Sequence, residues 1–263
     1  MHLTGNVGPI PAGVALTEFY DVLELQSKGA RPKIVLQQEF ADFLSGWAPL
    51  QHHKYIIKWA QRNHVPILTT NFDTVLSQAG DCELQHTTQE GFTDFYPWNS
   101  YFGNSQLISP TADFGIWHIN GTVKYRRSIR LGLTHYMGSV ERARGLIKKG
   151  NERRLLSENN LAGWPGVNSW LHIIFHKPLL IFGLELDENE IFLRWLLIER
   201  ARYYYKFPAR KKMAWYAYTS SNEKDGKLFF LKGVGVTPIK VNDYADIYGN
   251  ESWPTARLNS TRG

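Results

Sequence analysis

Apolar residues recur along the chain in two patterns, which predict helices and strands in alternation. Helical spacing of apolar positions predicts long helices at residues 34–47, 50–63 and 191–205, and shorter ones at 167–175 and 222–232. Short continuous apolar runs predict strands at residues 65–68, 115–119, 178–182, 213–218 and 236–241. Because strands and helices alternate with short connections, we expect an α/β fold. The expected architecture is a doubly wound, mostly parallel, Rossmann-like sheet with helices on both faces.

Three segments refine this picture. The run at residues 178–182 is bounded by proline and glycine, which is typical of a strand covered on both faces. Residues 91–113 carry few helix or strand signals and are expected to form a long loop, either a binding loop or a simple wrapping segment. Residues 134–165 are expected to form a helical, strongly basic insertion whose charges are solvated, with nucleic-acid contact as the minor alternative.

The predicted strand at residues 65–68 ends in polar residues that make it the first candidate site. Thr69 and Thr70 close the strand, and Asn71 and Asp73 follow in a tight turn before a helix. A helix that opens near Asn or Asp gains an acceptor for its first free N–H groups. Open α/β sheets bind their ligands at the carboxyl ends of their strands. The preceding His52 and His53 are expected to be solvated.

A second strand end carries a similar pattern. The strand at residues 115–119 runs through His118 to an Asn-Gly turn at Asn120 and Gly121. In a regular strand, residues two apart point to the same face, so the side chains of His118 and Asn120 are expected to leave together. By contrast, the Gly- and Pro-rich residues 4–13 form either a phosphate cradle or a turn-forming terminus.

Composition limits the class of protein. The chain has 263 residues, of which 43% are hydrophobic, so it can bury a sizeable core as one domain, residues 1–263. Its single cysteine, Cys82, excludes an internal disulfide framework and a four-cysteine zinc site, and a reducing compartment is expected. No apolar run reaches the roughly 18 residues that cross a bilayer, so we expect a soluble, cytoplasmic protein. The net charge of +6 favours an ordinary solvated surface over a nucleic-acid partner.

Three motifs, in this order, resemble those of bacterial SIR2-like domains, which are sirtuin relatives often found in anti-phage defence systems. The motifs are Thr69-Thr70-Asn71-Phe72-Asp73, the strand ending His118-Ile119-Asn120-Gly121-Thr122, and the strand leading into Gly183-Leu184-Glu185-Leu186-Asp187. The segment 235–244 agrees as well, so the resemblance covers about residues 30–248.

The resemblance implies an NAD+ site at the carboxyl ends of the strands, with no metal. Asn71 would contact the nicotinamide ribose and help to place a water molecule, and Asp73 would lie near the nicotinamide amide. Gly183 would let the adenosine half approach the backbone, and Asn242 would meet the adenine ribose. The other residues implied to contact the cofactor are Thr69, Thr70, Gly121, Leu184 and Glu185.

The chain departs from the family pattern at two positions. The family histidine stands immediately before the glycine, where this chain has Asn120. His118 either replaces it as the base, from ~6.6 Å further back along the strand, or packs beside Trp117. Residues 5–8 form only a degenerate version of the Gly-Ala-Gly turn of the family.

The expected function is an NAD+ glycohydrolase that releases nicotinamide and ADP-ribose. The chain lacks the cysteines of the zinc module of deacetylase sirtuins. The alternatives are a catalytically impaired domain that binds NAD+ or ADP-ribose as an assembly module, and a nucleic-acid-binding protein. A homo-oligomer and a separate defence subunit, such as an ATPase, are the expected protein partners.

Overall fold

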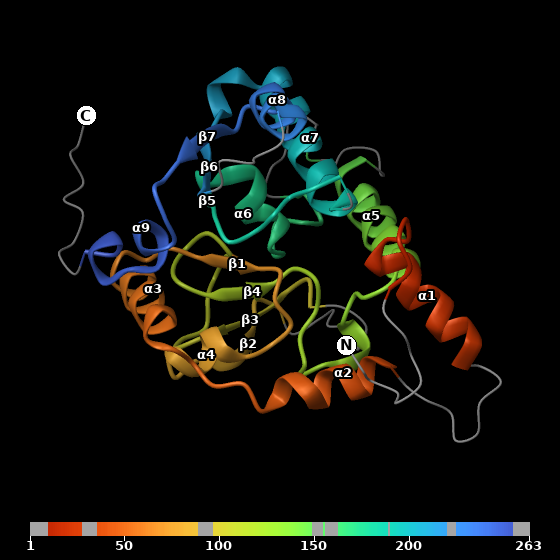
Figure 1. Cartoon of the computed structure of the whole chain (residues 1–263). Coiled ribbons are helices and arrows are strands. Elements are labelled where there is room, and N and C mark those ends of the chain that lie inside the picture. The colour runs from red at the N-terminus through yellow and green to blue at the C-terminus, as the bar shows by residue number, and fades with distance from the viewer. Residues whose placement is uncertain are drawn as a thin grey trace.

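The structure is a computed structural model, and it describes residues 10–27, 36–88, 97–148, 155, 163–188, 190–219 and 225–254. It is a mixed α/β protein with two sheets (Figure 1). The first sheet has the strand order β1-β4-β3-β2 and the second has the order β5-β6-β7. The strands are β1 (Ile67–Thr69), β2 (Glu83–His86), β3 (Ser100–Gly103), β4 (Ile116–His118), β5 (Leu179–Ile181), β6 (Ala214–Tyr218) and β7 (Thr237–Lys240).

The second sheet is entirely parallel, and the first is mixed. Strand β1 pairs in parallel with β4, with Thr69 opposite His118, whereas β3 pairs antiparallel with both β4 and β2. The five predicted strands are confirmed as β1, β4, β5, β6 and β7. The prediction of a loop throughout residues 91–113 is wrong, because β3 lies within it, while residues 91–96 fall outside the described part. Strand β3 forms because Tyr101 and Phe102 are buried, at 1% and 3% exposure, between two partner strands.

Strand β5 differs from its prediction in one respect. Its alternating side chains Leu179 and Ile181 pack against the main core, whereas Leu180 is 53% exposed. The expectation that this strand is covered on both faces is therefore wrong. Strand β5 is one edge strand of the second sheet, and β1 is one edge strand of the first. Leu68 of β1 packs against the same main core as β5.

Helices surround the two sheets (Figure 1). The predicted helices are confirmed to within about four residues where they are described, while α1 was not predicted. The expected residues 34–35, 149–154, 156–162 and 222–224 lie outside the described part. The α-helices are α1 (Leu16–Ser27), α2 (Leu36–Ser45), α3 (Gln51–Arg62), α4 (Val75–Ala79), α5 (Leu133–Lys148), α6 (Leu171–His176), α7 (Ile191–Lys206), α8 (Asp225–Gly233) and α9 (Ala245–Tyr248). The 3₁₀-helices are η1 (Arg126–Ser128), η2 (Pro208–Arg210) and η3 (Asn250–Ser252).

The basic segment is part of the packed structure where it is described. Helix α5 contacts α7, and Lys148 Nζ lies 2.9 Å from the carboxylate of Glu199, a side chain that is 1% exposed. Arg202 binds the same carboxylate oxygen at 2.6 Å. Other basic residues of α5, such as Arg142 and Arg144, are exposed, as expected for a solvated face.

Candidate functional site

The carboxyl end of β1 forms a polar turn. Thr69, which is 8% exposed, accepts the Asn71 N–H on its hydroxyl oxygen at 3.1 Å. The Asp73 carboxylate accepts the N–H of Val75, the first residue of α4, at 2.9 Å, and its side chain is 7% exposed. Thr70 is half-buried, and Asn71 is exposed. Within the described chain, no hydrogen bond holds the Asn71 side-chain amide, so it is available to a ligand.

His118 lies next to this turn at the end of β4. Its Nδ1 is 2.8 Å from the main-chain oxygen of Asn71, and since a carbonyl can only accept, Nδ1 carries the proton. In the neutral ring, Nε2 is then an unprotonated acceptor, and it is buried without a hydrogen-bond partner in the described residues. Burial lowers the pKa of His118, and the opposing effects of the Asn71 carbonyl and the Asp73 charge are smaller. The ring is therefore a neutral imidazole with one free acceptor.

Asn120 and Gly121 lie in the turn after β4. The strand ends at His118, so the alternation expected to place His118 and Asn120 on one face does not extend to Asn120. The Asn120 side chain is 4% exposed, and its Oδ1 has no partner among the described residues. Gly121 has φ of +100°, and a Cβ there would lie 2.1 Å from the Ser128 carbonyl oxygen. Glycine is thus required where the turn crosses that carbonyl.

The carboxyl end of β5 supplies the second group of expected site residues. Gly183 is exposed with φ of +64°, and a Cβ there would lie 2.2 Å from the hydroxyl of Tyr248. The carbonyls of Leu184 and Glu185 accept hydrogen bonds from the Tyr216 hydroxyl at 2.9 and 3.1 Å. These contacts fix the backbone that leaves β5, while the Glu185 side chain remains exposed.

Asn242 and the segment 4–13, the other two expected parts of the site, are not joined to the strand ends described above. Asn242 follows β7, is exposed and donates its main-chain N–H to Asp246 at 2.8 Å. In the described part, no hydrogen bond joins it to Asn71 or Gly183. The Gly- and Pro-rich segment 4–13 is described only from Ile10 onward, so its first two glycines lie outside the described residues.

The structure adds three residues to the site that the sequence pattern missed. Tyr248, which stands over Gly183, packs against the ring of His52 with centroids 5.5 Å apart. His52 Nε2 lies 3.1 Å from His53 Nε2, and the Asp73 charge acts on His53. The contacts link Gly183 to His53, on whose pKa the Asp73 charge has a raising effect. Both histidines are half-buried, so they are only partly solvated.

The topology explains how these histidines reach the site. Helix α3 precedes β1 and returns along the sheet, so its first turn lies near the carboxyl end of that strand. The Leu50 N–H donates to His53 Nδ1 at 2.9 Å, which leaves the proton of the neutral ring on Nε2, directed at His52. Burial and the neighbouring His52 lower the pKa of His53. A pair of histidines in the first turn of the helix that precedes such a strand was the available sequence signal.

The described residues contain no cluster of three or more His, Cys, Asp or Glu side chains that could hold a metal ion. The described part of the chain also has no helix that is long and apolar enough to span a membrane. Cys82 is a free thiol whose pKa is raised to about 11 by burial and by Asp81, which disfavours the reactive thiolate.

Comparison with known proteins adds no relative. Neither a scan of family models, nor a search of curated proteins, nor a search of solved structures finds a match to this chain.

The site therefore combines three kinds of group at adjoining strand ends. An exposed carboxamide, Asn71, stands near a buried carboxylate, Asp73, whose charge acts on the imidazoles of His53 and His118, and burial lowers the pKa of both imidazoles. Such a set can hold a polar ligand through hydrogen bonds, stabilise developing positive charge and accept a proton near neutral pH.

Proposed function

We propose that this protein hydrolyses NAD+ to nicotinamide and ADP-ribose, as its resemblance to SIR2-like domains implies. The observation that carries the proposal is the grouping of unpaired polar atoms around the Asn71 turn. His118 Nε2 and Asn120 Oδ1 are both buried without partners in the described chain. Buried acceptors without partners are costly and rare, and a functional site is one recognised reason for them.

The reaction needs little covalent chemistry from the protein. Water attacks C1′ of the nicotinamide ribose, the bond from C1′ to the pyridinium nitrogen breaks, and nicotinamide leaves with the electron pair. The other products are ADP-ribose and one proton. Because the transition state resembles an oxocarbenium ion, a carboxylate such as Asp73 and an oriented carboxamide such as Asn71 are suited to stabilise it.

The proton of the attacking water requires an acceptor. His118 Nε2 has the required lone pair, but its ring is only 2% exposed, so a ligand must displace neighbouring side chains to reach it. His52 and His53 are half-buried at the same strand end and are more accessible. In both of these rings, however, a hydrogen bond occupies the lone pair, because His53 Nδ1 accepts from the Leu50 N–H and His52 Nε2 accepts from His53 Nε2. We therefore assign the base to His118, on which the Asp73 charge also acts.

The enclosure of His118 favours a second candidate function, which is binding of NAD+ or ADP-ribose without turnover. In that case His118 holds the Asn71 backbone in place through its 2.8 Å hydrogen bond. Asn120, which cannot take up a proton as an imidazole does, would then only orient the ligand.

The experiment is nicotinamide release from NAD+ by the purified protein, compared with its Asn71→Ala variant. This substitution removes the exposed carboxamide but keeps the backbone carbonyl that holds His118, so folding should be unchanged. We expect at least about a 100-fold loss of kcat, the effect of removing one group that stabilises the transition state. An unchanged melting temperature is the control for folding.

Two further variants separate the candidate functions. If His118→Asn, whose amide can still donate to the Asn71 carbonyl, abolishes turnover while NAD+ still binds, His118 is the base. If the wild-type protein binds NAD+ without product and Asn120→His restores nicotinamide release, the binding function is correct. The proposal fails if the wild-type protein neither binds nor cleaves NAD+ in any oligomeric state.

A further inference from the structure

The outer face of the second sheet is apolar and exposed. Leu180 of β5 is paired with Trp215 of β6, and Ala217, two residues further along β6, is paired with Ile239 of β7. Paired residues, and residues two apart in a strand, lie on the same face, so these four side chains form one surface. Leu180 is 53% exposed, Ile239 is 40% exposed, and Met213, directly before β6, is 61% exposed. Within the described chain, this face is therefore an apolar patch on the surface.

The opposite face of this sheet is covered. Helices α6, α7 and α8 lie on that side, and the buried Ala214 and Tyr216 of β6 belong to the main core together with residues of these helices (Figure 1). Trp215, which lies between them in β6, is only half-buried and packs against neither core cluster of the described residues. All-parallel sheets are almost always covered on both faces. We therefore expect a second cover, on the outer face, which the described residues do not supply.

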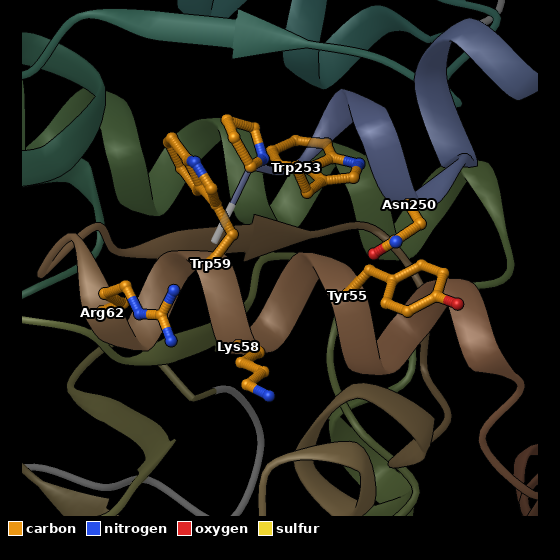
Figure 2. Close-up of a pocket in the computed structure, with 7 residues that line it drawn as sticks. Tyr55, Lys58, Trp59, Arg62, Asn250 and Trp253 are labelled. Carbon is orange, nitrogen blue, oxygen red and sulfur yellow. The ribbon is translucent and has the colours of Figure 1, made fainter. Parts of the chain in front are cut away.

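The aromatic residues of the last described segment gather only at the carboxyl end of β5. Phe182, directly after β5, contacts Trp253 with ring centroids 5.5 Å apart. Trp253 in turn packs edge to face with Trp59 of α3, with centroids 5.2 Å apart, and Figure 2 shows both rings above this helix. These contacts leave the side chains of Leu180 and Ile239 exposed.

Opposite charges lie at the two ends of the outer face. Lys211 and Lys212 precede β6, at the amino ends of the parallel strands, whereas Asp246 of α9 and Glu251 of η3 follow β7, at the carboxyl ends. All four side chains are exposed, and none of them forms an ion pair within the described chain. Lys240, the last residue of β7, points to the other face because it alternates with the exposed apolar residue before it. The outer face is therefore basic at one end and acidic at the other.

This charge pattern is complementary to itself. A twofold axis that lies between two copies, perpendicular to their strands, brings the two outer faces together with the strands antiparallel. The lysines of each copy then lie opposite the carboxylates of the other, and both contacts form at once. Two sheets packed in this aligned way bury their facing side chains in a layer ~10 Å thick. With the strands parallel, like charges would meet, which is unfavourable.

We propose that two copies of this chain associate through the outer face of β5, β6 and β7, with their strands antiparallel. Leu180, Trp215 and Ile239 form the apolar centre of the contact, and Lys211 and Lys212 pair with the acidic end of the partner subunit. The contact is independent of the proposed NAD+ hydrolysis, so Asn71→Ala leaves the association unchanged.

The test of the charges uses two variants of the full chain, studied alone and mixed, by analytical ultracentrifugation. The acidic variant is Lys211→Glu with Lys212→Glu, and the basic variant is Asp246→Lys with Glu251→Lys. For the wild type we expect a dimer with a Kd on the order of 10⁻⁶ M or tighter. Each variant alone brings like charges together at both ends of the contact, so its Kd should rise by about tenfold or more. An equimolar mixture should form a 1:1 complex with a Kd within about threefold of the wild-type value, because every charged contact is then again between opposite charges.

Folding and net charge have their own controls. Asp246 accepts the Asn242 N–H at 2.8 Å, so the melting temperature of the basic variant is measured, and Glu251→Lys alone replaces the variant if it is unfolded. Glu at the exposed Arg142 and Arg144 of α5 changes the net charge as much as the acidic variant does, and should change the Kd by less than about twofold.

The apolar centre is tested separately. Leu180→Lys and Ile239→Lys should each weaken the dimer by about tenfold or more, because a charge is then buried in the contact. Phe229→Lys, on α8, is the matched control, since Phe229 is 81% exposed and lies outside the proposed contact. The proposal is overturned by a wild type that stays monomeric at about 10⁻⁴ M, by a mixture that associates no better than the separate variants, or by equal losses in Leu180→Lys and Phe229→Lys.

Discussion

Replacing Gly121 by alanine tests the turn that carries Asn120. At φ of +100° an L-residue is strained, and the new Cβ would lie 2.1 Å from the Ser128 carbonyl oxygen. The obstacle is backbone, so the turn itself must move. That movement breaks the pair of hydrogen bonds between Ser128 and Thr122, in which the Ser128 hydroxyl accepts from the Thr122 N–H at 2.9 Å and donates to the Thr122 carbonyl at 3.3 Å.

The expected loss of stability is the sum of the backbone strain at position 121 and the two lost hydrogen bonds. A non-glycine residue at positive φ costs about 1–3 kcal/mol, and each lost hydrogen bond costs about 1 kcal/mol. Gly121→Ala should therefore lower the free energy of unfolding by about 3–5 kcal/mol. With about 2.1 cal/mol/K of unfolding entropy per residue, 263 residues give ~0.55 kcal/mol/K. The corresponding fall in melting temperature is about 5–9 °C.

Calorimetry or thermal circular dichroism measures this shift, and Gly138→Ala is its control. A Cβ at Gly138, inside α5, has no heavy atom within 4 Å, so alanine there should stabilise the helix by about 0.5–1 kcal/mol. The two variants make the same chemical change with opposite expected signs. A Gly121→Ala protein that melts within about 1 °C of the wild type would refute the geometry of this turn.

Two further predictions concern buried charge. Arg200 is 2% exposed and donates hydrogen bonds to four main-chain carbonyls. Arg200→Met should therefore lower the free energy of unfolding, measured by urea titration, by at least about 3 kcal/mol. A loss below about 1 kcal/mol would contradict this. Burial, with nearby His176 and Lys177, lowers the pKa of His172 to about 4. As the pH falls from about 6.5 to 4, the imidazole of His172 is therefore protonated in the unfolded state before it is protonated in the folded state. Stability should fall across that window and less steeply in His172→Gln; identical pH profiles would exclude His172 as a cause.

Periodicity predicted most of the fold because most elements show it in their own residues. The buried Leu196 and Leu197 give α7 a core face that the sequence displays directly. Helix α1 was missed because only Tyr20 in it is buried, while its apolar Leu16 and Leu25 are more than 60% exposed. Its pattern therefore does not describe a single core face.

The antiparallel strands were missed for a different reason. Strand β2 is short and mostly polar, and it exists because it pairs with β3, whose residue Phe102 is in turn opposite Ile116 of β4. That pairing joins segments that are separate in the sequence, so the local alternation of apolar and polar residues does not predict it. The exposure of Leu180 likewise depends on what covers β5 and not on the strand's own residues.

The residues of the candidate site also differ in whether the sequence could predict them. Asn71, Asp73 and His118 were predictable because each lies at or just past the end of a strand, and the parallel pairing of β1 with β4 brings those ends together. His52 and Tyr248 were not, because their contact joins helices almost 200 residues apart in the chain. Sequence patterns identify strand ends, whereas the side chains that enclose them come from the tertiary fold.

The most direct test of the account is the structure of this protein with NAD+ bound. The account predicts the nicotinamide ribose beside the Asn71 carboxamide, the nicotinamide near Asp73, and the adenosine half toward Gly183 and Tyr248. A complex in which NAD+ lies away from these residues would contradict it. So would the absence of bound NAD+ at millimolar concentration.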